Sequence, residues 1–141
     1  MIEYTITLER VDWEALKADL IKDDFHNGRT TAQLRLSFEN SSYVAMAFDQ
    51  IRCIANGRML SDGVGNALVI DVWTQSAYRC KAIATTIMRM LITAVPGQHI
   101  YLQSDEAVGF YSKLGFWKQP EGLAMISGKY LENETRNVEA L

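Results

Sequence analysis

Several features that would indicate other classes of protein are scarce in this 141-residue sequence. Its two cysteines, Cys53 and Cys80, lie far apart and form no Cys-x-x-Cys pair or Cys/His cluster, so the sequence suggests neither a metal site nor a disulfide framework. No apolar run approaches membrane-spanning length, and charged residues near the N-terminus, such as Glu9 and Arg10, do not fit a signal peptide. We therefore expect a cytoplasmic protein with no membrane partner.

Basic charge and nucleotide-binding motifs are also lacking. The formal net charge is −3, which provides no basic footprint for nucleic acid and slightly favours cationic small molecules as ligands. The sequence contains neither a Walker-type Gly-Lys-Ser/Thr motif nor Gly-x-Gly-x-x-Gly. These absences argue against nucleic acid as a partner and against a nucleotide-binding domain of the Walker or Gly-x-Gly-x-x-Gly type.

The length and composition that remain are those of one globular domain. A chain of 141 residues can bury a substantial core but is short for two domains, and 48% hydrophobic with 22% charged residues is ordinary for this class. We expect residues 1–131 to form a single domain and the mostly polar residues 132–141 to be a loosely held tail.

The most informative stretch runs from Val69 to Leu91. Val69–Trp73 is typical of a buried strand, and a polar loop follows it. From Ala82 the apolar residues recur at helical spacing, at positions 83, 87, 90, 91 and 94. A helix that starts just after a strand presents unpaired N–H groups and the positive end of its dipole. The pattern predicts an anion-binding strand–loop–helix unit.

The loop of this unit resembles the acetyl-CoA pyrophosphate loop of the GNAT superfamily of N-acetyltransferases. That loop reads Gln or Arg, two residues, Gly, one residue, then Gly or Ala. Arg79 and Ala84 match it, whereas Ala82 occupies the position of the usual Gly. Glycine there permits close backbone approach to the pyrophosphate. If residue 82 has ordinary helical dihedral angles, its methyl group should be tolerated.

A second motif, Ala107–Phe116, resembles the GNAT motif in which a short helix ends in Phe-Tyr-x-Lys-x-Gly-Phe. Phe110, Tyr111 and Leu114 lie at helical spacing, and Gly115 stands where a left-handed C-terminal cap belongs. The alternative is an ordinary capped amphipathic helix. Because both motifs occur in the family's order, the chain is identified as resembling a small, bacterial-type, single-domain member of this superfamily.

The resemblance implies an α/β fold with a mixed, largely antiparallel sheet flanked by about four helices. Residues 30–38 are ambiguous by periodicity, which allows a helix capped by Thr30 or Thr31 or a strand; the resemblance favours a helix. The other expected elements are a strand at Tyr4–Leu8, a helix capped by Asp12 and ending near Asp23 or Asp24, a hairpin of Tyr43–Phe48 and Ile51–Ser61 with a bulge at Gly57, and strands at Gln98–Gln103 and Leu123–Leu131.

The resemblance also implies acetyl-CoA (CoA) as co-substrate, with no metal. Backbone groups of Val72, Trp73 and Thr74 would bind the pantetheine arm. Ser104 occupies a position where many relatives carry a cofactor-contacting Asn. Backbone N–H groups would bind the pyrophosphate, with an added contact from the Arg79 guanidinium, and they belong to Arg79, Cys80, Lys81, Ala82, Ile83 and Ala84.

Two residues are candidates for acid–base chemistry. Tyr111 matches the family position whose phenol often protonates the CoA sulfur; the alternative is a hydroxyl that satisfies a buried polar group. Asp71 interrupts an apolar strand beside the expected thioester and is a candidate base, with a structural ion pair as the alternative. Ordered water can also serve as base in the family. His26 and His99 are interpreted as packing or surface residues.

The function implied is direct acetyl transfer from acetyl-CoA to a primary amine of a small molecule or peptide. Candidate walls of the acceptor site are Phe25, Phe48, Trp73 and Trp117, although such aromatics are more often core. Ala82 and Ser104 favour one alternative, a catalytically silent acyl-CoA-binding sensor or interaction domain. A second alternative is an unrelated phosphate-binding α/β domain. A homodimer through edge strands is compatible with the sequence, which shows no interface.

Overall fold

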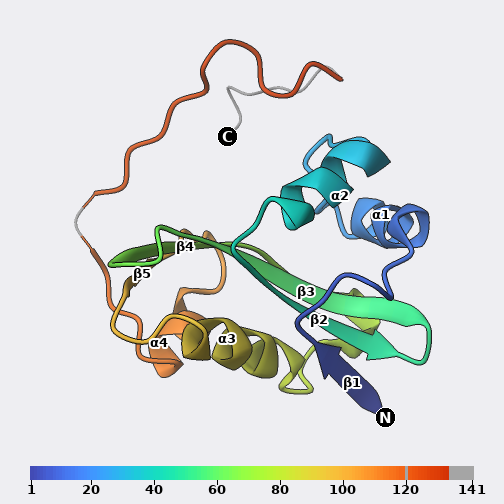
Figure 1. Ribbon diagram of the computed structural model, residues 1–141, viewed down its shortest axis with the longest axis horizontal. Helices are drawn as coiled ribbons and strands as arrows, with labels where there is room; N and C mark the ends of the chain where they lie inside the picture. Colours follow the sequence, from blue (N-terminus) through green and yellow to red (C-terminus); the bar gives the residue numbers. More distant parts are fainter. Residues whose placement is uncertain (120, 134–141) are drawn as a thin grey trace.

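The computed structural model describes residues 1–119 and 121–133, and these form one five-stranded sheet flanked by helices (Figure 1). The expected mixed, largely antiparallel sheet with four α-helices is confirmed. The elements are β1 (Ile2–Thr5), α1 (Trp13–Lys22), α2 (Thr31–Glu39), β2 (Tyr43–Asp49), β3 (Arg52–Ser61), β4 (Asn66–Thr74), the 3-10 turn η1 (Ser76–Tyr78), α3 (Ile83–Thr93), β5 (His99–Tyr101) and α4 (Val108–Lys113).

The sheet has the strand order β1-β2-β3-β4-β5, and its first four strands are antiparallel neighbours. The chain then crosses through α3 and returns as β5, parallel to β4, as a crossover through a helix requires. β4 and β5 pair only at Asn66–Leu68 and His99–Tyr101. Among the described residues, β4 from Val69 to Thr74 therefore has a strand partner only on its β3 side.

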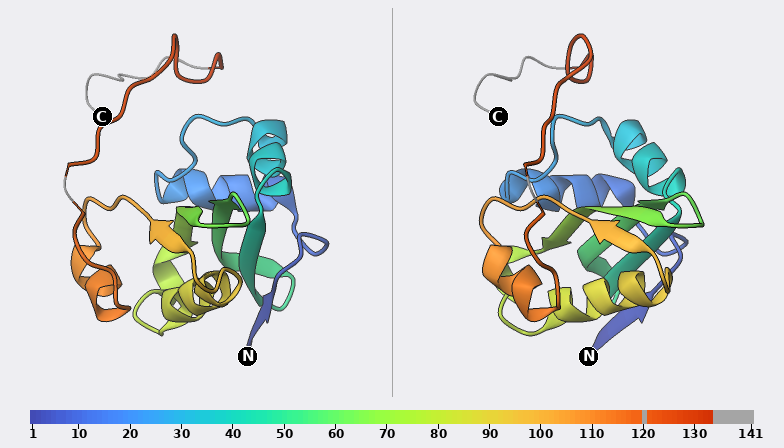
Figure 2. Two further views of the ribbon diagram at one scale, coloured as in Figure 1. Left: turned by 60° about the vertical axis from the view of Figure 1, so that its left-hand side comes forward. Right: turned by 90° about the vertical axis from the view of Figure 1, so that its left-hand side faces the viewer.

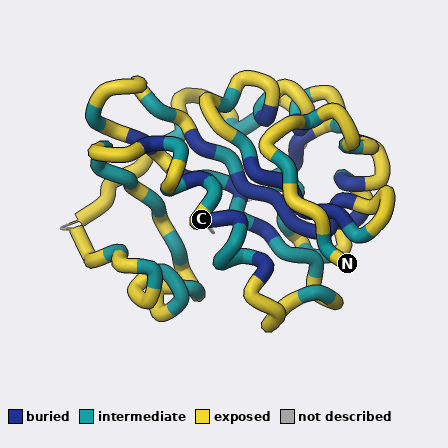
Figure 3. Tube along the Cα trace, turned by 60° about the horizontal axis from the view of Figure 1, so that its bottom comes forward, coloured by how far each residue is buried: buried dark blue, intermediate teal, exposed yellow. Residues whose placement is uncertain are grey.

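Helices cover both faces of the sheet. α1 and α2 lie on one face, and α3 and α4 lie on the other (Figures 1 and 2). Each face has its own apolar core: Leu16, Leu34 and Phe38 pack on the first, and Ile87, Met88 and Leu91 on the second. The buried residues run through the central strands (Figure 3). β4 is therefore packed on both faces, while its edge beyond Leu68 is open.

The register between β3 and β4 changes at a two-against-one bulge. Asn56 pairs with Trp73 and Arg58 with Ile70, so Gly57 alone faces two residues of β4, Asp71 and Val72. Asp71 has φ 58°, which is left-handed and turns the strand locally. The register shift at Gly57 was expected, but the extra residue lies in β4 rather than in β3. The bulge lets Ile70 and Asp71 face the α2 side together.

Helix α2 resolves the ambiguity of residues 30–38. Thr30 accepts a hydrogen bond from the backbone N–H of Gln33, whose side chain accepts one from the Thr30 N–H, which completes a capping box. Leu34 and Phe38, four residues apart, are buried, whereas Leu36 is exposed. A strand would place all three on one face. The expected Asp12 cap of α1 is also confirmed, by a bond from the Ala15 N–H at 3.1 Å.

The bounds of several strands differ from the expectation, most of all those of β1 and β5. β1 covers Ile2–Thr5 rather than Tyr4–Leu8, because the Thr7 N–H donates to the Thr5 hydroxyl at 3.2 Å and bends the chain away from β2. β5 covers only His99–Tyr101 of the expected Gln98–Gln103, because β4 pairs with it only as far as Leu68.

The strand expected at Leu123–Leu131 is wrong. Positive φ angles at Gly128 and Leu131 break the extended conformation that a strand requires. Residues 121–133 instead run out from the sheet toward α2 (Figure 1). There the Asn133 amide donates to the Gly28 carbonyl at 3.1 Å and exchanges hydrogen bonds with the Gln33 side chain.

Candidate active site

The N-terminus of α3 keeps the N–H donors that an anion needs. The first intrahelical bond runs from the Thr86 N–H to the Ala82 carbonyl, and no side chain caps the helix. Within the described ranges, the N–H groups of Ile83, Ala84 and Thr85 thus have no acceptor. The first turn also carries no acidic residue that would repel a phosphate. The predicted loop is therefore suited to a pyrophosphate.

Ala82 has left-handed dihedral angles, φ 62° and ψ 17°, so it does not have the ordinary helical conformation that would make its methyl group harmless. Cys80 is left-handed too, with φ 62°. Glycine takes up this conformation without strain, whereas alanine does so at a cost of about 1–2 kcal/mol. The usual Gly of the motif thus has a conformational reason here, in addition to close approach.

The cationic side chains of the loop contact protein groups. The Arg79 Nε donates to the Thr74 carbonyl at 3.1 Å, and its Nη2 lies 3.7 Å from an Asp23 carboxylate oxygen. Lys81 places its Nζ 5.6 Å from the centre of the Tyr78 ring. Arg79 therefore ties the loop to the end of β4 and to α1. Its contact with a pyrophosphate stays a prediction.

The open edge of β4 presents the three residues expected to bind pantetheine. Val72 packs toward α3, and Trp73 is buried on the α1 side, where its Nε1 donates to Asp23 at 2.9 Å. The Thr74 hydroxyl is buried without a hydrogen-bond partner in the described part of the chain. An unpaired hydroxyl beside an unpaired strand edge suits a polar, extended ligand such as the pantetheine arm.

Tyr111 is held by the helix end that the second motif encodes. The N–H of Phe116 donates to the Tyr111 carbonyl at 3.2 Å, and that of Gly115 to Ser112 at 3.1 Å, with Gly115 at φ 104°. This is a Schellman cap, so the predicted cap at Gly115 is confirmed. The Tyr111 ring packs edge-on against Phe110 and Phe116, at 5.0 and 5.8 Å between centroids.

The Tyr111 hydroxyl makes no hydrogen bond with any described residue, so it does not serve to satisfy a buried polar partner there. Partial burial raises the pKa of the Tyr111 phenol above its ordinary value of 10.0. The phenol is therefore protonated at neutral pH. Ser104, at the start of the same motif, accepts a bond from the Ala107 N–H at 2.9 Å and so orders the turn into α4.

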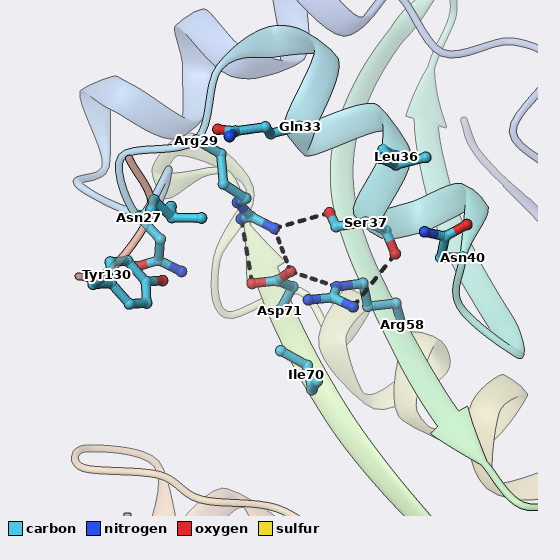
Figure 4. Close-up of a pocket in the computed structure, with 11 residues that line it drawn as sticks. Asn27, Arg29, Gln33, Leu36, Ser37, Asn40, Arg58, Ile70, Asp71 and Tyr130 are labelled. Carbon is cyan, nitrogen blue, oxygen red and sulfur yellow. Dashed lines mark hydrogen bonds and ion pairs between the residues drawn. The ribbon is translucent and has the colours of Figure 1, made fainter. Parts of the chain in front are cut away.

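Asp71 lies between two arginines (Figure 4). Its Oδ2 accepts from Arg29 Nη1 at 2.8 Å and from Arg58 Nε at 2.6 Å, and its Oδ1 accepts from Arg29 Nη2 at 3.4 Å. The side chains of Asp71, Arg29 and Arg58 are 5%, 8% and 13% exposed. These contacts match the alternative expectation, that Asp71 forms a structural ion pair. The role of Asp71 as a base stays a prediction.

Arg29 and Arg58 are not among the site residues predicted from the sequence. They lie 42 and 13 residues from Asp71, and only the fold brings them to it. A left-handed Asn27 and Gly28 turn Arg29 inward, and β3 carries Arg58. One signal was present: Arg58 interrupts an otherwise largely apolar strand, as Asp71 does, and two opposite charges in adjacent buried strands indicate an ion pair.

The aromatic residues proposed as acceptor walls take other places. Phe48 and Trp73 are fully buried in the core, and Phe25 packs against that core. Trp117 is exposed, and its ring stacks on that of His99 with 6.2 Å between the ring centroids. Among the described residues, no group of three or more His, Cys, Asp or Glu could hold a metal ion. None of the described helices is long and apolar enough to cross a membrane.

An uncapped helix N-terminus, an open strand edge and a phenol at a capped helix end are arranged as expected for an acyltransferase. The chain belongs to the GNAT acetyltransferase family, whose family model matches residues 6–116. No curated protein matches it closely enough in sequence to count as a relative.

Solved structures of GNAT acetyltransferases share the fold. A GNAT-family protein of Xanthomonas campestris is 18% identical, with 92% of this chain and 96% of that chain covered and a TM-score of 0.77. A GNAT-family acetyltransferase of Streptococcus pneumoniae is 20% identical, with 92% and 98% covered and a TM-score of 0.73. Glucosamine-6-phosphate N-acetyltransferase of Arabidopsis thaliana is 16% identical, with 89% and 98% covered and a TM-score of 0.70.

Proposed function

We propose that this protein transfers an acetyl group from acetyl-CoA directly to a primary amine of a small molecule or peptide. The observation that carries the proposal is the uncapped α3 N-terminus, which follows a β4 edge left open from Val69 to Thr74. Family membership supports acetyl transfer as the reaction class. Similar solved structures have names that imply different acceptors, so they do not identify the amine.

Different residues of this chain would bind the cofactor and transfer protons. Ile83, Ala84 and their neighbours back to Arg79 would bind the pyrophosphate, and Val72 to Thr74 would orient the pantetheine arm. Acetyl-CoA supplies an activated thioester, and the leaving thiolate needs a proton. Tyr111 would donate it, because its phenol is protonated and its hydroxyl is uncommitted within the described chain. Asp71 or ordered water would accept the proton of the amine.

The competing function is an acyl-CoA-binding domain without catalysis. The left-handed Ala82 and the Ser104 hydroxyl, which is used at the turn into α4, support this alternative. The uncommitted Tyr111 hydroxyl supports catalysis. We further propose a single domain over residues 1–131, a cytoplasmic location and homodimer formation. The polar tail 132–141 lies outside the described residues from position 134 onward.

The test is a Tyr111→Phe variant assayed for CoA thiol release with a panel of amines. Loss of the general acid should lower kcat by about a hundredfold, while the rise in melting temperature on adding acetyl-CoA stays as in the wild type. Tyr43→Phe makes the same change at an exposed position on β2 and should retain wild-type turnover.

Three other results would redirect the proposal. Wild-type turnover in Tyr111→Phe would remove Tyr111 from the mechanism. A thermal shift with acetyl-CoA but no thiol release with any amine would favour the sensor alternative. No thermal shift with acetyl-CoA or CoA would reject the cofactor site.

A further inference from the structure

A pocket of about 400 Å³ lies on the α2 side of the sheet, between α2 and the bulged part of β4. Arg29, Arg58 and Asp71 form its floor, and the amides of Asn27 and Gln33 lie at its rim (Figure 4). Its volume is within the range of small-molecule sites. A mix of guanidinium and amide donors on a partly apolar wall is suited to a small ligand that carries polar acceptor atoms.

The pocket carries one more positive charge than negative charge. Arg29, Arg58 and Asp71 are the charged residues that line it in the described chain, so two guanidinium groups share one carboxylate. All three side chains are at least 87% buried, and an uncompensated buried charge is costly. An anion from outside the chain would compensate it. The local charge is thus opposite in sign to the net charge of −3 of the whole chain.

Donor groups also remain free for such an anion. Arg58 uses Nε on Asp71 and Nη1 on Ser37 and Ser41, and its Nη2 has no acceptor among the described residues. Arg29 Nη2 reaches Asp71 only at 3.4 Å and has a second hydrogen to offer. Planar guanidinium groups with spare N–H donors are well suited to carboxylate and phosphate groups.

We propose that this pocket binds a carboxylate or phosphate group of the acceptor amine, with Arg29 and Arg58 as the residues that determine this specificity. The inference rests on the proposed acetyl transfer. The bulge connects the two sites, because Ile70 and Asp71 line the pocket while the next residues, Val72 to Thr74, form the open edge of β4. An anionic group bound at the arginines would leave the amine of the same small molecule next to that edge.

The test compares amines that differ only in charge. ω-Amino carboxylates are paired with their amides, and 2-aminoethyl phosphate is paired with ethanolamine, at equal concentrations of neutral amine. In the wild type, kcat/KM should be about tenfold or more higher for the anionic member of a pair. Arg58→Gln should reduce this ratio to near one. Arg35→Gln makes the same change on the exposed side of α2 and should retain it.

A binding readout separates this inference from the proposed activity. Titration with the same amines should shift the NMR Nε–H signals of Arg29 and Arg58 saturably for anionic members only, and the signal of Arg35 should not move. If these signals shift but acetyl-CoA produces no thermal shift, the acetyl-transfer proposal fails and the anion site remains.

Two results would overturn the anion site itself: equal shifts and equal kcat/KM for charged and neutral members, or an anionic preference that Arg58→Gln leaves unchanged. A preference confined to the carboxylate series or to the phosphate series would identify which of the two groups the pocket takes.

Discussion

At the scale of single residues, the left-handed positions matter most for this site. Asp71, Cys80 and Ala82 all have φ near 60°, and each lies on the path from β4 to α3. L-residues adopt this conformation at a cost, and they persist in it where the surrounding structure requires it. These three left-handed residues therefore lie at the bulge of β4 and in the loop before α3, where the backbone changes direction.

Substituting Ala82 by glycine should make the protein more stable. Glycine removes the left-handed penalty, so the free energy of unfolding should rise by about 0.5–1 kcal/mol in urea titrations. Ala84→Gly is the matched control: residue 84 lies inside α3, where glycine should lower the free energy of unfolding by about 0.5–1 kcal/mol. Equal losses in both variants would show that residue 82 is not left-handed in solution.

The same Ala82→Gly variant tests the cofactor site. Because the substitution also removes the methyl group at the loop, the Kd of acetyl-CoA should fall or stay the same. A weaker affinity in Ala82→Gly would mean that the methyl group contributes to binding.

At the scale of elements, the close approach of α3 to the sheet depends on Gly57. A Cβ at this position would lie 2.8 Å from the Ile87 Cγ2 and 3.1 Å from the Leu91 Cδ1, both in the tightly packed core. Gly57 is also the single residue opposite the two-residue bulge of β4. Absence of a side chain therefore lets α3 pack over the strand pair that positions Asp71.

Gly57→Ala should lower the free energy of unfolding by on the order of 1–3 kcal/mol, since the branched Ile87 in a full core cannot yield freely. Thermal and urea unfolding would measure this. Gly65→Ala is the control, because a Cβ there meets nothing within 4 Å, and its effect should stay within about 0.5 kcal/mol. A neutral Gly57→Ala would mean that α3 sits farther from β3 than described.

At the scale of the whole molecule, the stability of the described chain comes from the two cores on either side of the sheet. Residues 121–133 contribute little to them, since Leu123 and Met125 are 91% and 87% exposed. This segment nevertheless reaches the α2 side of the sheet, where Leu131 lines the pocket and Asn133 bonds to the loop before α2. It contacts the candidate site without being part of the core.

The double substitution Leu123→Ser and Met125→Ser should leave the free energy of unfolding unchanged within about 0.5 kcal/mol. Leu91→Ala, in the core under α3, should lower it by about 2–5 kcal/mol. If the double variant instead lost several kcal/mol, this segment would be paired in solution. A melting temperature that rises with protein concentration would then assign the pairing to a homodimer.

Local patterns were sufficient to predict much of this protein. The caps at Asp12 and Gly115, the hairpin of β2 and β3, and the strand–loop–helix of β4 and α3 depend on neighbours within a few residues. Such interactions are the same in any fold, so they can be read along the chain. The strand predicted at Leu123–Leu131 shows the limit of local patterns. A strand also needs a neighbouring strand to pair with, which the local sequence does not reveal.

The sequence by itself determined most helices and strands, their order, and the two motifs that indicate a GNAT domain, but neither the state of residues 30–38 nor the absence of a strand at Leu123–Leu131. Only the tertiary structure decided that Asp71 meets Arg29 and Arg58, that β4 bulges opposite Gly57, and that Ala82 is left-handed. The ion pairs and the bulge depend on contacts between residues far apart in sequence. Coulomb attraction and packing act through space, and the fold sets which distant residues are close enough to interact.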